Sequence, residues 1–342
     1  MEPLLLLAVL LICFIVAFAI GSNDETMSPA VGARVFTVRA AVVIGGAINI
    51  IGAISLGGGV SEKVGSDLVG GQILTTSMIF AILISMAIWL LVASATKGLP
   101  ISTTQCIVGS VIGVAIGAPL LGIAGWGISS VDWLVVAEIF IGWVLSPVVG
   151  FVIAGLVFAL VRRIQKRAAG LSAHERQEKL AAYALALFLI ITGLSRGGND
   201  VANAVAPLVN MADFQGTVTL GSFTIGAIMI PLIVGGIGIA MGLAVVGRKV
   251  IKTLATEVVT LTPVSALSAS ISVSLVMFVG TFFGLPLSGT HVLVAALIAV
   301  GWVSREPVKK KQVNNILISW VITVPISAIL GIGMLFLTQM IF

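Results

Sequence analysis

Charged residues are scarce in this chain. Only 9% of its 342 residues are Asp, Glu, Lys or Arg, whereas a typical soluble domain carries about a quarter. Since 59% of the residues are hydrophobic, a soluble protein of this composition could not cover its surface with polar side chains. Lipid solvates apolar side chains, so the composition indicates a protein whose surroundings are a lipid bilayer.

Cysteine is also scarce, and the familiar catalytic patterns are missing. Cys13 and Cys106 both lie in apolar runs, so neither a disulfide framework nor a metal-type spacing is indicated. There is no Walker motif, nucleophile elbow or zinc-ligand spacing. We therefore expect no enzyme and no cofactor. A membrane enzyme remains an alternative class for which the sequence offers no nucleophile, base or metal set.

Ten hydrophobic segments follow one another along the chain. They are long and continuous, which favours helices over barrel strands. The first run lacks a basic start and ends in Gly-Ser-Asn-Asp, so we interpret it as a mature span rather than a signal peptide. The segments cover residues 2–21, 38–57, 71–96, 101–120, 133–161, 180–197, 217–246, 258–284, 288–303 and 314–341.

The basic residues predict how these segments are oriented. The net charge of +5 could indicate a nucleic-acid partner, but the basic residues fall in short loops, where they set membrane orientation. Lys63 and Arg196 fall on the side of the membrane opposite the other basic residues, with Arg196 at a segment edge. Both termini are therefore predicted outside a cell membrane, and no nucleic-acid partner is expected. The cytoplasmic loops would hold Arg34, Arg39, Lys97, Arg162, Arg163, Lys166, Arg167, Arg176, Lys179, Arg248, Lys249, Lys252, Arg305, Lys309, Lys310 and Lys311.

A basic linker divides the chain into two related halves. Residues 1–161 and 180–342 hold five segments each, and the cytoplasmic linker covers residues 162–179. Because five is odd, the second half enters the membrane from the opposite face. The sequence thus predicts an all-α polytopic membrane protein with an inverted-topology repeat, about 10–12 transmembrane helices and broken or re-entrant segments. The matched landmarks are Gly21-Ser22-Asn23-Asp24 with Gly197-Gly198-Asn199-Asp200, Pro100–Gln105 with Pro286–His291, and Trp143 and Pro147 with Trp320 and Pro325.

The duplicated Asn-Asp pairs are candidate cation ligands. Asn23, Asp24, Asn199 and Asp200 each follow glycine at the end of an apolar run. One such pair could be only a helix stop with a polar turn. Two equivalent copies favour an ion path, since acidic residues at membrane depth are costly. Their oxygen atoms suit a small hard cation such as Na⁺, or they bridge such a cation to an anion.

The duplicated proline-hydroxyl motifs are candidate anion sites. Each proline precedes a hydroxyl cluster where a helix is predicted to begin. The plainer interpretation is a capped helix, but a helix N-terminus also offers free N–H donors to an anion. We expect the two N-termini to face one tetrahedral oxyanion near the middle of the membrane. The candidate donors are Ser102, Thr103, Thr104, Ser288 and Thr290.

Charge balance favours a cotransported cation. Two carboxylates and a divalent anion would place about four negative charges in a region without water, which is strongly disfavoured. Cotransported Na⁺, or protonation of the aspartates, would relieve the repulsion. His291 could relay protons or simply form hydrogen bonds, and Gln105 at the matching position cannot titrate.

Taken together, these motifs resemble the inorganic phosphate transporter (PiT) family of phosphate permeases. The closest resemblance lies in Gly197–Ala204, which includes Asn203, in Gly236–Leu243 with Arg248–Thr253, and in Gly284–Val294. The resemblance implies secondary active symport of inorganic phosphate coupled to Na⁺ or H⁺. It also implies twelve spans, so residues 133–161, 217–246 and 258–284 are candidates for hidden hairpins or broken helices.

The chain departs from that family at several positions. Glu25-Thr26-Met27 replaces the small apolar residues and second asparagine of the usual motif, and Asn49 and Ser270 stand where many members carry acids. Sulfate has a similar size and shape, so a sulfate permease of the same fold remains an alternative, as does a passive anion channel. The sequence leaves open whether the chain forms a homo-oligomer.

Overall fold

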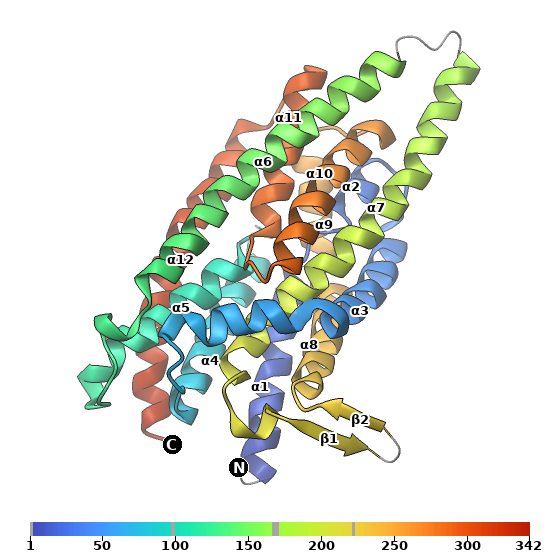
Figure 1. Ribbon diagram of the computed structural model, residues 1–342. Coiled ribbons are helices and arrows are strands. Elements are labelled where there is room, and N and C mark those ends of the chain that lie inside the picture. The colour runs from blue at the N-terminus through green and yellow to red at the C-terminus, as the bar shows by residue number, and fades with distance from the viewer. Residues whose placement is uncertain (1–2, 97–99, 166–170, 221–222) are drawn as a thin grey trace.

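The computed structural model describes residues 3–96, 100–165, 171–220 and 223–342. They form an elongated bundle of helices (Figure 1). Each of the ten predicted hydrophobic segments overlaps one of the apolar helices, so the polytopic helical fold is confirmed. The helices are α1 (Pro3–Ser22), α2 (Ser28–Gly32), α3 (Val38–Gly65), α4 (Thr76–Thr96), α5 (Thr103–Gly117), α6 (Trp133–Gln165), α7 (Leu171–Val205), α8 (Met229–Gly242), α9 (Arg248–Glu257), α10 (Pro263–Phe282), α11 (Gly289–Ser304) and α12 (Lys310–Gln339).

Most of these helices are long enough to cross a bilayer. Within the described residues, nine helical segments have the length and apolar composition of a membrane span, and α11 is a shorter apolar helix. Short helical turns join them. These are η1 (Asp67–Val69), η2 (Ala118–Leu121), η3 (Ile128–Ser130), η4 (Ala206–Leu208), η5 (Ala212–Phe214) and a π-helical turn, η6 (Leu243–Gly247), between α8 and α9.

Side chains that face outward on the long helices are apolar. Leu134 and Leu156 on α6 and Val321 and Ile329 on α12 are each at least two-thirds exposed. The interior is also largely apolar, but it contains buried polar residues such as Ser110 and Ser268. The apolar outer surface matches a protein solvated by lipid.

Both chain ends lie at the same end of the bundle. Figure 1 marks N and C at the lower end, whereas the end of α6 and the start of α7 lie at the upper end. This agrees with the predicted shared side of the termini. Which side faces the cytoplasm stays a prediction, and Lys97, Lys166 and Arg167 lie outside the described residues.

The described residues of the predicted linker, 162–165 and 171–179, are helical. Helix α6 continues to Gln165, and α7 already begins at Leu171, well before the predicted segment start at residue 180. Hydropathy marks where a span stops being apolar, not where the helix ends. Ala, Glu, Arg, Gln and Lys are strong helix formers, so the polar stretch extends the helix.

A β-hairpin corrects the purely helical prediction for residues 217–246. Strands β1 (Thr217–Leu220) and β2 (Phe223–Gly226) pair antiparallel, with Thr217 opposite Gly226. The β-branched and aromatic residues of this stretch favour strands. The expected helical hairpins are also absent from the described residues of the other two runs, because α6 is one continuous helix and α10 begins only at Pro263.

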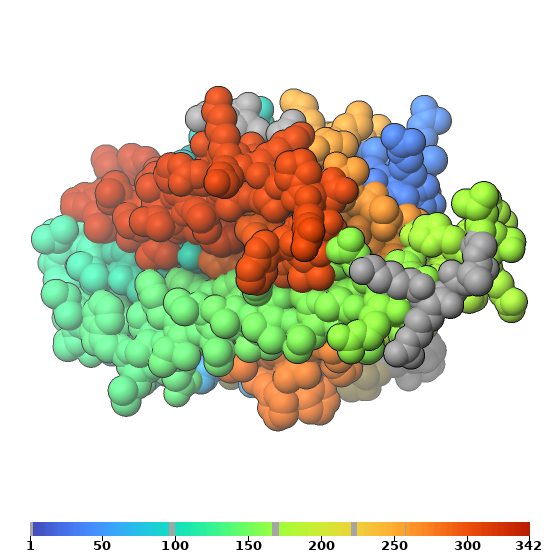
Figure 2. All heavy atoms as spheres, turned by 90° about the horizontal axis from the view of Figure 1, so that it is seen from above, coloured from blue at the N-terminus to red at the C-terminus, as the bar shows by residue number. Residues whose placement is uncertain are grey.

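Helices of one half pack mainly against helices of the other. In the predicted pairing, α1, α3, α4, α5 and α6 correspond to α7, α8, α10, α11 and α12. Helix α1 packs on α8 while α7 packs on α3, and α4 and α5 pack on α12 while α10 and α11 pack on α6. The view from above shows α6 lying along the later part of the chain (Figure 2). This reciprocal arrangement is the one expected of two related halves, and their inversion stays a prediction.

Glycines allow these helices to approach closely. A Cβ atom built at Gly21 would lie 1.9 Å from the carbonyl oxygen of Ile239, and one at the equivalent Gly197 would lie 2.6 Å from that of Asn49. No side chain fits in either position without moving backbone. The same two glycines therefore set the α1–α8 and α3–α7 distances next to the Asn-Asp motifs.

The α1–α8 contact generates a stability prediction. A Cβ at Gly242 would lie 1.9 Å from the carbonyl oxygen of Phe18, whereas nothing lies within 4 Å of one at Gly333. We expect Gly242→Ala to destabilise the protein by about 1–3 kcal/mol, the usual cost of overpacking. Thermal unfolding of the purified protein in detergent measures this. Gly333→Ala is the matched control, and equal melting temperatures for the two variants would contradict the packing argument.

Candidate functional site

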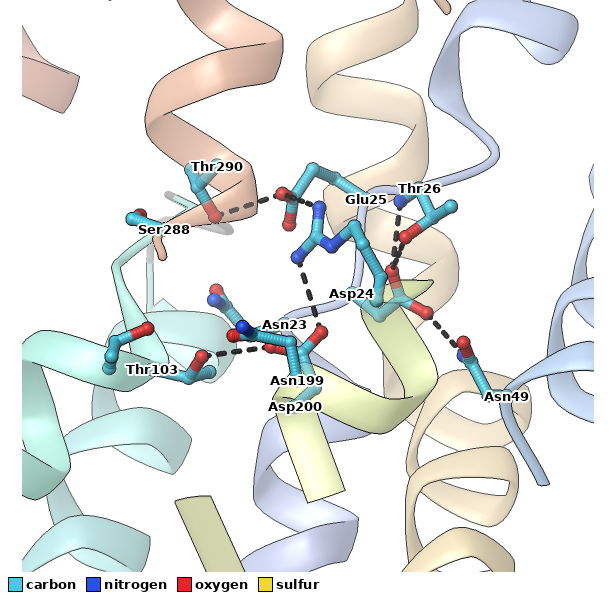
Figure 3. Close-up of polar contacts among 12 residues, drawn as sticks. Asn23, Asp24, Glu25, Thr26, Asn49, Thr103, Asn199, Asp200, Ser288 and Thr290 are labelled. Atoms are coloured by element: carbon cyan, nitrogen blue, oxygen red, sulfur yellow. Dashed lines mark hydrogen bonds and ion pairs between the residues drawn. The ribbon is translucent and has the colours of Figure 1, made fainter. Parts of the chain in front are cut away.

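The first Asn-Asp pair lies in the break between α1 and α2. Pro29 occupies the first turn of α2, where a proline cannot continue the hydrogen bonding of α1. Oδ1 of Asp24 accepts hydrogen bonds from the Thr26 backbone N–H (2.8 Å) and hydroxyl (2.6 Å). Oδ2 accepts one from the Asn49 amide at 2.7 Å (Figure 3). Both oxygens of Asp24 are thus held in a nonhelical segment.

The second Asn-Asp pair lies inside a helix. The prediction that this segment ends near Gly197 was wrong, because α7 continues to Val205. The residues after Asp200 include no proline until position 207, so nothing interrupts the helical hydrogen bonding. Oδ1 of Asp200 accepts a hydrogen bond from the Thr103 hydroxyl at 3.1 Å. The site is therefore built from one broken and one continuous helix.

The two asparagines hold the connections between the short helices. The Asn23 amide donates to the carbonyl of Ile101 (2.7 Å), and its oxygen accepts from the Ile101 N–H (3.3 Å). The Asn199 amide donates to the carbonyl of Leu285 at 3.1 Å. Each asparagine thus anchors the connection of its own half, α4–α5 or α10–α11. The Asn199 oxygen has no hydrogen-bond partner in the described part of the chain.

Both proline-hydroxyl motifs form the predicted helix caps. The Ser102 hydroxyl accepts from the Gln105 N–H at 3.3 Å at the start of α5, and the Ser288 hydroxyl accepts from the His291 N–H at 3.4 Å at the start of α11. Both serines are buried. The two helix N-termini therefore end inside the bundle, with the remaining free N–H groups of their first turns available to an acceptor.

The two N-termini meet, and they meet the Asn-Asp motifs. The Thr104 hydroxyl donates to the carbonyl of Leu287 at 3.0 Å, which joins the start of α5 to the connection before α11. Thr103 contacts Asp200, and Thr290 donates to Glu25 at 2.8 Å (Figure 3). The fold thus gathers the predicted cation and anion residues into one buried cluster.

The three further candidates lie at the edge of this cluster. The Asn203 amide donates to the Asn199 carbonyl (3.2 Å) and contacts the Thr103 hydroxyl (3.4 Å). The His291 ring stacks on Trp320 with centroids 3.8 Å apart. Neither ring nitrogen of His291 nor the side-chain oxygen of Gln105 has a hydrogen-bond partner among the described residues. A proton relay through His291 stays a prediction.

Arg196 and Glu25 are site residues that the sequence analysis missed. Arg196 was placed at a segment edge, but it lies inside α7 and is only 3% exposed. Its Nη1 donates to Oε1 of Glu25, and its Nη2 lies 3.3 Å from Oδ2 of Asp200. The four-residue spacing between Arg196 and Asp200 was a usable signal, since such pairs meet on a helix. The contact with Glu25 spans 171 residues and had none.

The cluster concentrates charge away from solvent. Asp24, Glu25 and Asp200 supply three carboxyl groups, and Arg196 supplies one guanidinium, all of them buried. Buried charges are stable only when they are paired and hydrogen bonded. Within the described residues, no group of three or more His, Cys, Asp or Glu side chains is arranged for a metal ion. The cluster combines hydroxyl, amide and carboxyl groups with a single guanidinium.

The fold and the cluster are those of a polytopic membrane protein with an enclosed polar cluster between two related halves. A model of the Phosphate transporter family matches the chain twice, over residues 20–174 and 165–331. The chain belongs to this family, which is one of transporters.

Similar proteins agree with this membership. A protein named as a phosphate permease in Thermococcus kodakarensis is 31% identical over 97% of both chains. The chloroplastic inorganic phosphate transporter 2-1 of Arabidopsis thaliana is 26% identical over 96% of this chain and 71% of its own length. A solved structure, named as the sodium-dependent phosphate transporter, superposes with a TM-score of 0.83 and 26% identity, covering 99% of this chain and all of its own.

The hydrogen bond from Thr104 to Leu287, which joins the start of α5 to the α10–α11 connection, generates a stability prediction. Thr104→Val removes the hydroxyl and leaves the buried Leu287 carbonyl without its donor, so we expect a loss of about 1–3 kcal/mol in stability. The melting temperature of the purified protein measures it. Thr104→Ser keeps the donor and is the matched control. A valine variant as stable as the serine variant would show that the hydrogen bond is dispensable.

Proposed function

We propose that this protein is a secondary active symporter that moves inorganic phosphate across a cell membrane together with Na⁺. The observation that supports this proposal most strongly is that two capped helix N-termini meet beside the two Asn-Asp motifs in one buried cluster. Residues 1–161 and 180–342 would act as inverted repeats, with residues 162–179 in the cytoplasm and both termini outside.

The anion would bind at the paired helix N-termini. Ser102 and Ser288 use their hydroxyl oxygens as caps, so their protons are free to donate to an anion. Thr103 and Thr290 would exchange their present acceptors, Asp200 and Glu25, for phosphate oxygens. Thr104 also belongs to this set, although its hydroxyl now donates to the carbonyl of Leu287. Backbone N–H groups and helix dipoles add to the attraction.

The cation would bind at Asn23, Asp24, Asn199 and Asp200. The unpartnered Asn199 oxygen and the remaining lone pairs of the two carboxylates provide hard oxygen ligands. A cation is needed there because three carboxyl groups and a phosphate outweigh the single guanidinium. Similarity to a solved structure named as a sodium-dependent transporter supports Na⁺ over H⁺. The Asn49 amide donates a hydrogen bond to Asp24. An acidic residue at position 49 would instead add another negative charge to the cluster.

Alternating access would carry the ions through. Every candidate site side chain is buried, so this conformation is closed to bulk water. Transport requires that the site open first to one side and then to the other, by rocking of one set of helices against another.

Uptake into proteoliposomes tests the coupling. We expect radiolabelled phosphate to accumulate above equilibrium when an inward Na⁺ gradient is imposed, and not when a pH gradient alone is imposed. Accumulation driven only by the pH gradient would replace Na⁺ with H⁺. Uptake that never exceeds equilibrium would indicate a passive channel, and stronger competition by sulfate than by phosphate would indicate a sulfate permease.

Substitution of the aspartates tests the site. We expect Asp24→Asn and Asp200→Asn each to lower Na⁺-driven uptake at least about tenfold, the effect of losing one hydrogen bond to a charged group. Initial uptake rates at matched amounts of membrane-inserted protein measure this. Glu138→Gln is the matched control, because this carboxylate is 59% exposed and pairs only with Lys63 at the surface. Normal uptake by both asparagine variants would refute the assignment.

A further inference from the structure

The ion pair between Glu25 and Arg196 breaks the symmetry of the two halves. The paired motifs align Glu25 with Val201 and Arg196 with Ile20, so neither charge has a counterpart in the other half. The side chains are 0% and 4% exposed, respectively. The pair joins the break after α1 to α7 at the point where the cation and anion candidates meet.

Two donors converge on one oxygen of Glu25. Nη1 of Arg196, from α7, and the hydroxyl of Thr290, from the first turn of α11, both donate to Oε1 (Figure 3). A guanidinium and a hydroxyl at a helix N-terminus are the donors that bind an oxyanion oxygen. The carboxylate oxygen of Glu25 thus occupies the position that such an oxygen would take.

The ion pair leaves hydrogen-bonding capacity unused. Nε of Arg196 and Oε2 of Glu25 have no partner in the described part of the chain. A Cβ built at Gly289 would lie 2.5 Å from that Nε, so the guanidinium rests directly on the first residue of α11. A purely structural pair that is buried should satisfy all of these atoms, because an unpaired buried polar group is costly. A contact that another anion can replace need not satisfy all of these atoms.

We propose that Arg196 binds the transported phosphate and that Glu25 is a tethered anion that occupies the guanidinium until phosphate displaces it. This proposal rests on the proposed function. A phosphate oxygen accepts from Nη1 of Arg196 and from the hydroxyl of Thr290, the two donors that Oε1 of Glu25 now occupies. Nη2 stays with Asp200, which ties the bound anion to a cation ligand.

Glu25 lies where such a displacement is feasible. It belongs to the nonhelical segment between Ser22 and Ser28, so its side chain can leave without breaking a helix. Two anions then compete for one guanidinium. Removing the charge of Glu25 should tighten phosphate binding, whereas removing that of Arg196 should weaken it.

Equilibrium binding of inorganic phosphate to the purified protein in saturating Na⁺ tests the proposal. We expect Glu25→Gln to lower the Kd about tenfold and Arg196→Gln to raise it at least about tenfold, in line with one charge-assisted hydrogen bond. Arg196→Lys keeps the charge but not the planar guanidinium, which also contacts Asp200 through Nη2, and should fall between wild type and Arg196→Gln. Lys63→Gln, at the partly exposed ion pair with Glu138, is the matched control and should leave the Kd unchanged.

The double variant Glu25→Gln with Arg196→Gln separates a binding role from a structural one. It removes both charges of the pair, so it remains informative even if Arg196→Gln alone fails to fold. We expect its Kd to lie at least about tenfold above that of Glu25→Gln, because phosphate then loses Arg196 with no competitor present. Equal Kd values for the double variant and Glu25→Gln, or an unchanged Kd in Glu25→Gln, would overturn the proposal. Wild-type protein that binds no phosphate would instead overturn the proposed function itself.

Discussion

Three carboxyl groups and one guanidinium lie together in the middle of the bundle, and the surrounding structure is arranged to keep them there. Since lipid offers no hydrogen bonds, each of these groups depends on partners from the protein. Thr26 and Asn49 hold Asp24, Thr103 and Arg196 hold Asp200, and Thr290 and Arg196 hold Glu25. These partners come from α3, α5, α7, α11 and the segment after α1, so the cluster requires both halves of the chain at once.

The reciprocal packing of the halves supplies those partners. Because α1 packs on α8 and α7 on α3, the two Asn-Asp motifs approach the centre from different sides. Glycines at equivalent positions in α1 and α7 permit the close approach. Each asparagine then anchors the connection of its own half, and the two capped helices meet between them. The symmetry is broken at Glu25 and Arg196, whose charges have no counterpart at the equivalent positions of the other half. The two halves therefore contribute different groups to the cluster.

Much of the fold and most of the residues in the cluster could be predicted from the sequence alone. The ten segments, the caps at Ser102 and Ser288 and the meeting of the duplicated motifs depend on local signals, namely apolar length, proline position and hydroxyl placement. The prediction for α7 was wrong because glycine and asparagine favour helix ends only weakly, and nothing after Asp200 interrupts the helix. Arg196 was misplaced for the same reason. An arginine at the edge of an apolar run resembles an interfacial charge, and only the continuous helix shows that it faces the interior.

The sequence by itself determined that this is a membrane protein of related halves with two kinds of duplicated polar motif, because hydropathy, loop charge and helix caps are properties of short stretches. Only the tertiary structure decided which side chains share the site. Glu25 and Arg196 are 171 residues apart, and no local pattern links them. They meet because close helix packing limits each buried charge to the few partners within reach, and those partners depend on the whole bundle.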